Sequence, residues 1–330
     1  ISPQNPVNGS KATITVTFSE LVNNVSASLD GVDVIFPNNE LATTWTGETA
    51  SPLTLSAGSS AVIAEVKAGY TDVSGNSGAA KSTNVAVKPQ LSLSPVAGND
   101  EIDSAEASSV VIEGTGVGFV SGDSVTVAVV STVDPTYSFE DHAEMTADGH
   151  WQTAAHNLTA WPVGDVSVNL SASNSPGIDA DSVSRLVTRV DTQPPSAISA
   201  ESQPLNPQFN QAVTLTVKFD EPVTGITVKV GDVNVDFGDT SSASDSWSGT
   251  TNAPVSFGAD ETSIDAVIRD FVDASGNLGA AFSHSIQVTP LIQLNAIAGD
   301  DVIDSDESHS VTITGSSKGF KAGDELSVRV

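Results

Sequence analysis

Cysteine is absent from this sequence of 330 residues, so no disulfide bond can stabilise its fold. Basic residues are scarce: 12 Lys and Arg stand against 41 Asp and Glu, which gives a formal net charge of −29. Nucleic acids and anionic membrane surfaces both require a basic surface on the protein, so this balance excludes them as partners. No run of 18 apolar residues occurs, and we therefore predict no direct insertion into a membrane.

Catalytic signatures are missing as well. The five histidines are scattered, and the sequence contains neither an H-E-x-x-H motif nor a G-x-S-x-G nucleophile elbow. Because there is no cysteine nucleophile either, we predict that the chain is not an enzyme. The sequence also begins without Met and without a signal-peptide-like apolar segment, so we expect both ends to be internal points of a longer protein.

The residues that are present describe a folded β protein. Hydrophobic residues make up 38% of the chain, which is enough for a core. They alternate with Ser and Thr, as in Ile14, Val16 and Phe18 or in the run 125–129, and this period of two is typical of half-buried strands. Such strands form antiparallel sheets with one solvated face. We predict an all-β chain of tandem immunoglobulin-like β-sandwich domains, which use about 100 residues each.

The chain repeats itself at an offset of 201 residues. Val16-Thr-Phe-Ser-Glu-Leu-Val22 recurs as Val217-Lys-Phe-Asp-Glu-Pro-Val223, and Ala97-Gly-Asn-Asp-Glu-Ile-Asp-Ser-Ala-Glu106 recurs from Ala298 with the same displacement. The repeating unit is therefore a pair of unlike domains. The predicted boundaries are 1–89 and 194–289 for the odd type, 90–193 for the even type, and 290–330 for the first part of another even-type domain.

Proline marks each predicted junction between domains. The connecting segments read Lys88-Pro-Gln90, Asp191-Thr-Gln-Pro-Pro195 and Thr289-Pro290. Short segments of this composition are stiff connectors rather than flexible coils. We therefore predict an extended, monomeric rod.

The odd-type domains carry oxygen ligands at positions that immunoglobulin topology brings to one pole. A glutamate follows the second predicted strand, and an Asp-x-x-Gly-Asn loop lies between the last two strands. The residues are Glu20, Asp72 and Asn76 in the first domain, and Glu221, Asp273 and Asn277 in the third, where Asp191 of the linker joins them. An all-oxygen set suits Ca²⁺, whereas Zn²⁺ would call for His or Cys. The alternative is that Asp-x-x-Gly-Asn is only a turn signal.

The even-type domains carry a second acidic pattern, in which three carboxylates stand three residues apart. The residues are Asp100, Asp103 and Glu106, repeated as Asp301, Asp304 and Glu307. This spacing places them on one side of a single loop or helical turn, which predicts a second cation site. The alternative is a solvated acidic loop without an ion, since the spacing matches neither an EF-hand nor the glycine-rich nonapeptide of calcium β-rolls.

The motifs F-[SD]-E-[LP]-V, D-x-S-G-N, the D-T-Q-P-P linker and A-G-[ND]-D-x-I-D-x-x-E resemble the bacterial Ig-like repeats of giant non-fimbrial adhesins exported by type I secretion, in particular those of SiiE-like and Bap-like biofilm proteins. The resemblance covers essentially the whole chain. It implies many such domains in a rod, with calcium bound by acidic residues near the joints. Two departures stand out: the last loop of the second domain reads Ser173-Asn-Ser-Pro-Gly177, and the first domain lacks the preceding linker Asp.

The resulting hypothesis is a calcium-stiffened stalk or adhesion segment of a secreted protein on the bacterial cell surface. Its expected partners are a host-cell surface, as in virulence, or a biofilm matrix, with glycans as candidate ligands. The alternative function is a calcium-dependent carbohydrate-binding module, in which exposed aromatic residues contact the sugar. Trp161, before Pro162, is the tryptophan that core packing explains least, whereas Trp45, Trp151 and Trp247 are expected in the core or at its edge.

Overall fold

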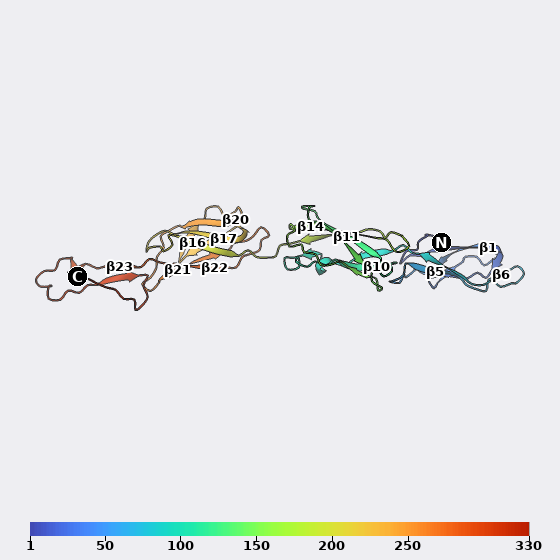
Figure 1. Ribbon diagram of the computed structural model, residues 1–330, viewed down its shortest axis with the longest axis horizontal. Helices are drawn as coiled ribbons and strands as arrows, with labels where there is room; N and C mark the ends of the chain where they lie inside the picture. The colour runs from blue at the N-terminus through green and yellow to red at the C-terminus, as the bar shows by residue number, and fades with distance from the viewer. Residues whose placement is uncertain (330) are drawn as a thin grey trace. The chain divides into compact units, whose positions relative to one another are not determined.

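The computed structural model describes residues 1–329 and consists of β-strands joined by loops (Figure 1). We call residues 1–89, 90–193, 194–289 and 290–329 domains 1 to 4, keeping the boundaries predicted above. The internal contacts divide the chain into two compact units: the first is Ile1–Asp191, which holds domains 1 and 2, and the second begins at Thr192. The prediction of an all-β chain of immunoglobulin-like sandwiches is confirmed.

Six strands of each odd-type domain correspond through the repeat. Domain 1 contains β1 (Thr13–Asn23), β2 (Ala27–Leu29), β3 (Val32–Ile35), β4 (Ala42–Thr49), β5 (Ala61–Val66), β6 (Thr71–Asp72) and β7 (Lys81–Ala86). Domain 3 contains β16 (Ala197–Gln203), β17 (Thr214–Val223), β18 (Thr227–Val230), β19 (Val233–Asp236), β20 (Ser244–Thr251), β21 (Ser263–Arg269) and β22 (Phe282–Gln287). Among residues 1–329, β6 and β16 have no counterpart strand in the other domain.

The even-type domains have a different set of elements. Domain 2 contains β8 (Gln90–Leu93), the 3₁₀ turn η1 (Val96–Gly98), β9 (Glu101–Ile102), β10 (Glu113–Val117), β11 (Ser124–Ser131), β12 (Ser138–Glu144), β13 (His150–Gln152), β14 (Gly164–Ala172) and β15 (Val183–Arg189). Domain 4 contains β23 (Leu291–Leu294), η2 (Ile297–Gly299) and β24 (Gly315–Lys318). The pairing of β23 with β24 keeps the register of β8 with β10, because Leu294 faces Gly315 as Leu93 faces Gly114.

In the odd-type domains the strands pair in the order β6-β1-β4-β3-β2-β5-β7 and β16-β17-β20-β19-β18-β21-β22. The short strands β3 and β19 link the two layers of each sandwich, since each pairs with a strand of both. The long strands β1 and β17 end beside the last loop of their domains: Val22 pairs with Asp72, and Thr224 forms a bridge with Val272. This topology brings the glutamate of β17 to the loop that carries Asp273.

Domain 2 consists of a small sheet, β13-β10-β8, and a larger sheet, β12-β11-β14-β15-β9. Its last strand, β15, pairs in parallel with β9, so that Thr188 lies opposite Glu101. This parallel contact brings the acidic loop before β9 close to the basic residues of β15. The loop and β15 are 85 residues apart in sequence at their Asp100–Arg185 contact.

The core of each sandwich is formed by the apolar residues that alternate along its strands. In β11, Val125, Val127 and Val129 are buried among apolar residues from both sheets of domain 2, as the period-two pattern predicts. Trp45, Trp151 and Trp247 are also buried, which confirms their assignment to the core. Val117 of β10 belongs to domain 2 in sequence but packs against the core cluster of domain 1. No helical segment among residues 1–329 has the length and apolar character needed to span a bilayer.

Candidate metal site

The last loop of domain 3 holds Asp273 in a fixed geometry. One carboxylate oxygen accepts hydrogen bonds from the N–H groups of Ser275 (2.8 Å) and Asn277 (2.9 Å), and the other accepts one from the Asn277 side-chain amide (2.9 Å). Gly276 has a φ of +88°, as expected of a tight turn that only glycine adopts without strain. Asn277 therefore donates to the aspartate, a role that the sequence pattern had not indicated.

The same loop keeps Asp273 ionised although it is only 4% exposed. Burial alone would raise the pKa of this carboxyl group, but the hydrogen bonds from the Asn277 side chain and from the loop N–H groups outweigh burial and lower the pKa. A lowered pKa means that the group carries its negative charge throughout the neutral range. The loop thus presents a permanent carboxylate at the end of the sandwich.

Domain 1 contains a second copy of the loop. Asp72 accepts hydrogen bonds from the N–H groups of Ser74 (2.8 Å) and Asn76 (2.9 Å) and from the Asn76 side chain (2.7 Å), and its pKa is lowered chiefly by that side-chain hydrogen bond. The same turn geometry therefore occurs in both copies. In domain 1 Glu20 is exposed near the end of β1, and both the cation site and the turn-signal alternative remain predictions there.

The two copies differ in what surrounds the aspartate. Asp191, Glu221 and Asp273 each offer a carboxylate oxygen, and these three oxygens all lie within 4.8 Å of one another. Asp191 is the residue before Thr192, where the second unit begins, and it also accepts a hydrogen bond from Ser104 (2.8 Å). Within residues 1–329, no other set of three His, Cys, Asp or Glu side chains meets this spacing. The structure thus brings together the three carboxylates that the sequence singled out, while their binding of an ion stays a prediction.

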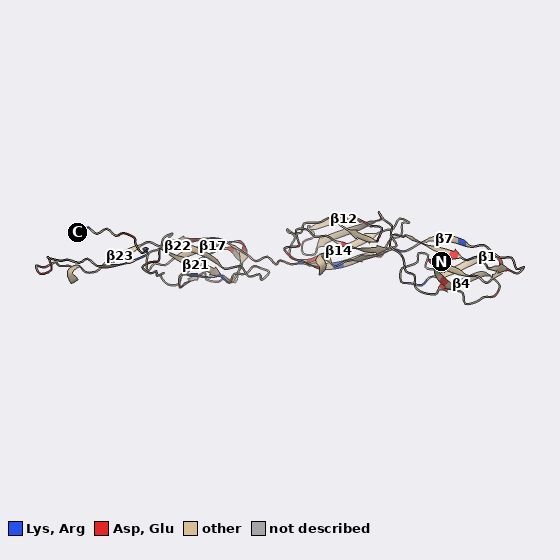
Figure 2. Cartoon of the chain, turned by 90° about the horizontal axis from the view of Figure 1, so that it is seen from below, with Lys and Arg blue, Asp and Glu red and all other residues tan. Residues whose placement is uncertain are grey.

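Three carboxylates at this spacing repel one another. Two unit charges 4 Å apart interact by about 1 kcal/mol in water and by about 4 kcal/mol at an effective dielectric constant of 20. Over the whole chain, acidic residues outnumber basic ones by 41 to 12; Figure 2 marks both kinds. A divalent cation with oxygen preference would relieve this repulsion, and Ca²⁺ accepts the irregular geometry that side chains from separate elements provide.

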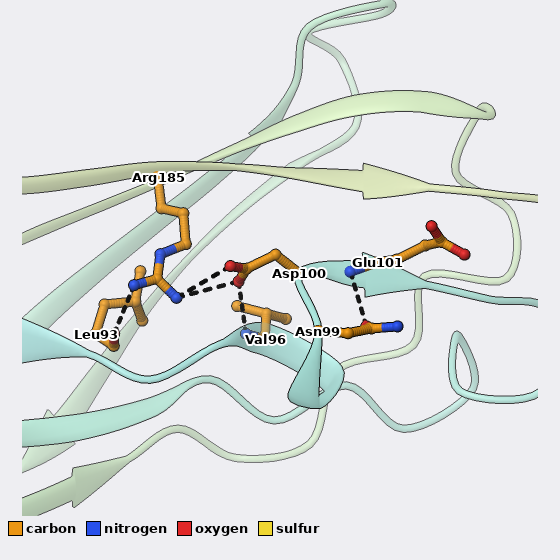
Figure 3. A network of polar contacts seen from close by, with 6 residues as sticks. All are labelled: Leu93, Val96, Asn99, Asp100, Glu101 and Arg185. Carbon is orange, nitrogen blue, oxygen red and sulfur yellow. Dashed lines mark hydrogen bonds and ion pairs between the residues drawn. The ribbon is translucent and has the colours of Figure 1, made fainter.

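The even-type acidic residues have a different arrangement. One guanidinium nitrogen of Arg185 donates hydrogen bonds to both carboxylate oxygens of Asp100, at 3.1 and 3.3 Å. The same carboxylate accepts the N–H of Val96 at 2.9 Å (Figure 3). The other guanidinium nitrogen of Arg185 donates to the carbonyl oxygen of Leu93 at 2.9 Å. This network ties η1 and β8 to the last strand of the domain. Sequence reasoning missed Arg185, although a rare basic residue in the last strand of an acidic domain was a usable signal.

Asp103 and Glu106 cap their own turn. Asp103 accepts hydrogen bonds from the N–H groups of Ala105 and Glu106, both at 2.8 Å, and Glu106 accepts the N–H of Asp103 at 3.2 Å. This reciprocal pattern is that of a capping box. Asp304 and Glu307 repeat the pattern, and Asp301 accepts the N–H of Ile297 at 2.9 Å, as Asp100 accepts that of Val96.

The three even-type carboxylates therefore do not converge in either copy within residues 1–329. In domain 2, Asp100 turns to Arg185, whereas Asp103 and Glu106 bind each other's backbone. A second cation site at these positions stays a prediction, and the three carboxylates do not lie close enough together to hold one ion between them.

Comparison with known proteins gives structural neighbours only. No family model matches the chain, and no curated protein matches it in sequence. Among solved structures, a tetra-tandem repeat in the extending region of a large adhesion protein is 14% identical, covers 96% of this chain and 88% of its own, and has a TM-score of 0.35. The titin I-band fragment I67–I69 is 13% identical, covers 86% and 93%, and has a TM-score of 0.40.

A third neighbour is described as a Ca²⁺-stabilised adhesin that helps an Antarctic bacterium reach out and bind ice. It is 18% identical, covers 93% of this chain and 77% of its own, and has a TM-score of 0.28. Identities and TM-scores this low assign no function.

Proposed function

We propose that this chain is a repeat segment of a secreted bacterial giant adhesin, in which calcium stiffens the stalk that carries the protein to a host-cell surface or a biofilm. The observation that carries the proposal is the group Asp191, Glu221 and Asp273, whose carboxylate oxygens lie within 4.8 Å of one another. One ligand precedes domain 3 and the other two belong to it. An ion held by all three would restrain the linker residues 191–194 against the end of β17 and the last loop.

The chemistry of the site suits an extracellular calcium level. Extracellular calcium modules bind with dissociation constants of about 0.1 to 1 mM. Millimolar calcium outside a cell would then occupy the site for much of the time, whereas cytosolic calcium would leave it free of the ion. Because the chain has no cysteine, it has no disulfide bonds with which to stiffen itself after export. Such a segment would be exported in a compliant state, by a route such as type I secretion, and would become stiff at the cell surface.

Small-angle scattering on the whole chain tests this proposal. With millimolar calcium we expect the maximum dimension of the chain to vary little between molecules. With a chelator we expect it to be smaller on average and to vary more. Thermal melting in the same two buffers should show a higher midpoint with calcium. If neither the scattering nor the melting responds to calcium, the proposal fails.

One observation favours the carbohydrate-binding alternative. Trp161 is only partly buried, and its ring lies 6.1 Å from that of Tyr137 and 6.0 Å from that of Phe139. The other three tryptophans are buried, so a sugar platform would have to use this cluster on domain 2. We expect no calcium-dependent binding of the chain on a glycan array. Reproducible binding that Trp161→Ala abolishes would instead establish the carbohydrate-binding function.

A further inference from the structure

The junction between domains 1 and 2 lies within one compact unit. Among residues 1–329, no cluster of three carboxylates like that of Asp191, Glu221 and Asp273 occurs at this junction. The central residue of the junction is Asn174, which is 3% exposed. The side-chain amide of Asn174 donates to the carbonyl oxygens of Val87 and Gly118, both at 3.0 Å. Val87 follows β7, the last strand of domain 1, and Gly118 follows β10 of domain 2, so a single buried amide joins the end of one domain to the next.

Asn174 occupies the place that Asp273 occupies in domain 3. Its side-chain oxygen accepts the N–H of Ile178 (3.0 Å), four residues on, as Asp273 accepts that of Asn277. The backbone hydrogen bonds also correspond. The carbonyl oxygen of Asn174 accepts the N–H of Gly177, and the N–H of Asn174 donates to the carbonyl oxygen of Ile178. Asp273 makes the same two backbone hydrogen bonds with Gly276 and Asn277. The two loops therefore share one geometry although their sequences differ. Where domain 3 presents a carboxylate, domain 2 presents an amide whose two N–H donors are both used.

Close packing accompanies this hydrogen bonding. Val117 packs against the core cluster of domain 1. A Cβ atom added to Gly118 would lie 2.9 Å from the Cα of Pro89 and 3.1 Å from a methyl group of Val87, so the linker proline rests directly on this glycine. The ion pair between Lys88 and Asp181 is exposed and adds little.

The second unit repeats this contact at the junction of domains 3 and 4. A Cβ atom on Gly319 would lie 3.2 Å from both the Cα of Pro290 and a methyl group of Val288. The N–H of Gly319 donates to the carbonyl oxygen of Gly258 (3.1 Å), and the N–H of Phe320 donates to that of Ala259 (3.0 Å). The packed contact between an odd-type domain and the even-type domain after it thus occurs in both copies.

We propose that the chain alternates two kinds of junction: each odd-to-even junction is a packed interface that stays fixed without any ion, and each even-to-odd junction is the one that calcium stiffens. The second half of this statement rests on the proposed function, and the first half does not. The stiff element of the stalk is then a pair of domains, and compliance without calcium is confined to one joint in every 201 residues. The same loop position carries an amide at residue 174, beside the first junction, and a carboxylate at residue 273, beside the second.

Distance measurements between spin labels test the two halves separately. The absence of cysteine allows labelled pairs at exposed serines of the full chain: Ser82 with Ser184 across domains 1 and 2, and Ser184 with Ser285 across domains 2 and 3. On adding a chelator we expect the first distance distribution to keep its width and the second to widen. A first distribution that widens on chelation overturns the inference. A second distribution that stays narrow overturns the proposed function and the second half of the inference, but leaves the first half standing.

Three variants test what fixes the first junction. Asn174→Asp keeps the size of the side chain but turns a carboxylate oxygen toward two carbonyl oxygens, so the Ser82–Ser184 distribution should widen in chelator. Gly118→Ala should widen it as well, whereas Gly98→Ala should not, because both glycines have a positive φ (+81° and +84°) but only Gly118 faces neighbouring atoms within 4 Å. If Asn174→Asp leaves the width unchanged, or if the two alanine variants behave alike, the packed junction is not what fixes this pair.

Discussion

Replacing Asp273 by asparagine should abolish most of the stabilisation that calcium gives to the chain. At about 10 mM calcium, a site with a dissociation constant of about 0.1 to 1 mM contributes about 1.4 to 2.7 kcal/mol by mass action. For a domain of roughly 100 residues this corresponds to a rise in melting temperature on the order of 10 °C. The asparagine side chain would keep one oxygen but lose the negative charge that attracts the ion. Calorimetry with calcium and with chelator measures the difference directly.

Asp72→Asn is the matched control. Asp72 accepts the same three hydrogen bonds as Asp273, at 2.7 to 2.9 Å, so both substitutions disturb the loop alike. Only Asp273 lies within 4.8 Å of two further carboxylates. The calcium-dependent shift should therefore survive in Asp72→Asn. Equal loss of the shift in both variants would show that loop stability, rather than ion binding, underlies the response.

The sequence indicated the carboxylates of the candidate site because each signal was either repeated or fixed by chain connectivity. The Asp-x-Ser-Gly-Asn loop occurs twice with the same spacing, and Asp191 precedes its domain by only a few residues. Alternating valines, as in β11, were sufficient to predict a sandwich, because a period of two has one interpretation in a chain without helical patterns. Local sequence patterns were therefore sufficient to predict the fold class and to single out the carboxylates of the candidate site.

The remaining features depend on contacts that no local pattern encodes. Arg185 reaches Asp100 only because β15 lies parallel to β9, and parallel pairing across 85 residues leaves no mark in either segment. Asn174 looked like a departure from the odd-type loop, since its neighbours differ from Ser-Gly-Asn. The hydrogen bonds show that it keeps the loop and changes only the chemistry at its tip. Comparing the two sequences showed that the loops at Asn174 and Asp273 differ, but not that they have the same geometry.

Arg185→Met should destabilise domain 2 by about 2 to 3 kcal/mol, because it removes charged hydrogen bonds and leaves Asp100 without its partner. The side chains of Arg185 and Asp100 are 30% and 34% exposed, so water offsets part of the loss and the effect stays below that of breaking a fully buried ion pair. Methionine retains the apolar stem, so the change isolates the charge and its hydrogen bonds. Chemical denaturation should show a lower midpoint with an unchanged slope.

Calcium distinguishes this network from the second cation site that the acidic spacing predicted. If Asp100 serves the ion pair, Asp100→Asn and Arg185→Met each lower the stability of domain 2 equally with calcium and with chelator. The double variant should then lose less than the sum of the single losses, by about 1 to 2 kcal/mol, because either change alone already breaks the contact. If Asp100→Asn instead removes a calcium-dependent shift while Arg185→Met has no effect, Asp100 is a calcium ligand. The first outcome would leave Asp191, Glu221 and Asp273 as the carboxylates through which calcium acts on this chain, because only these three converge among residues 1–329.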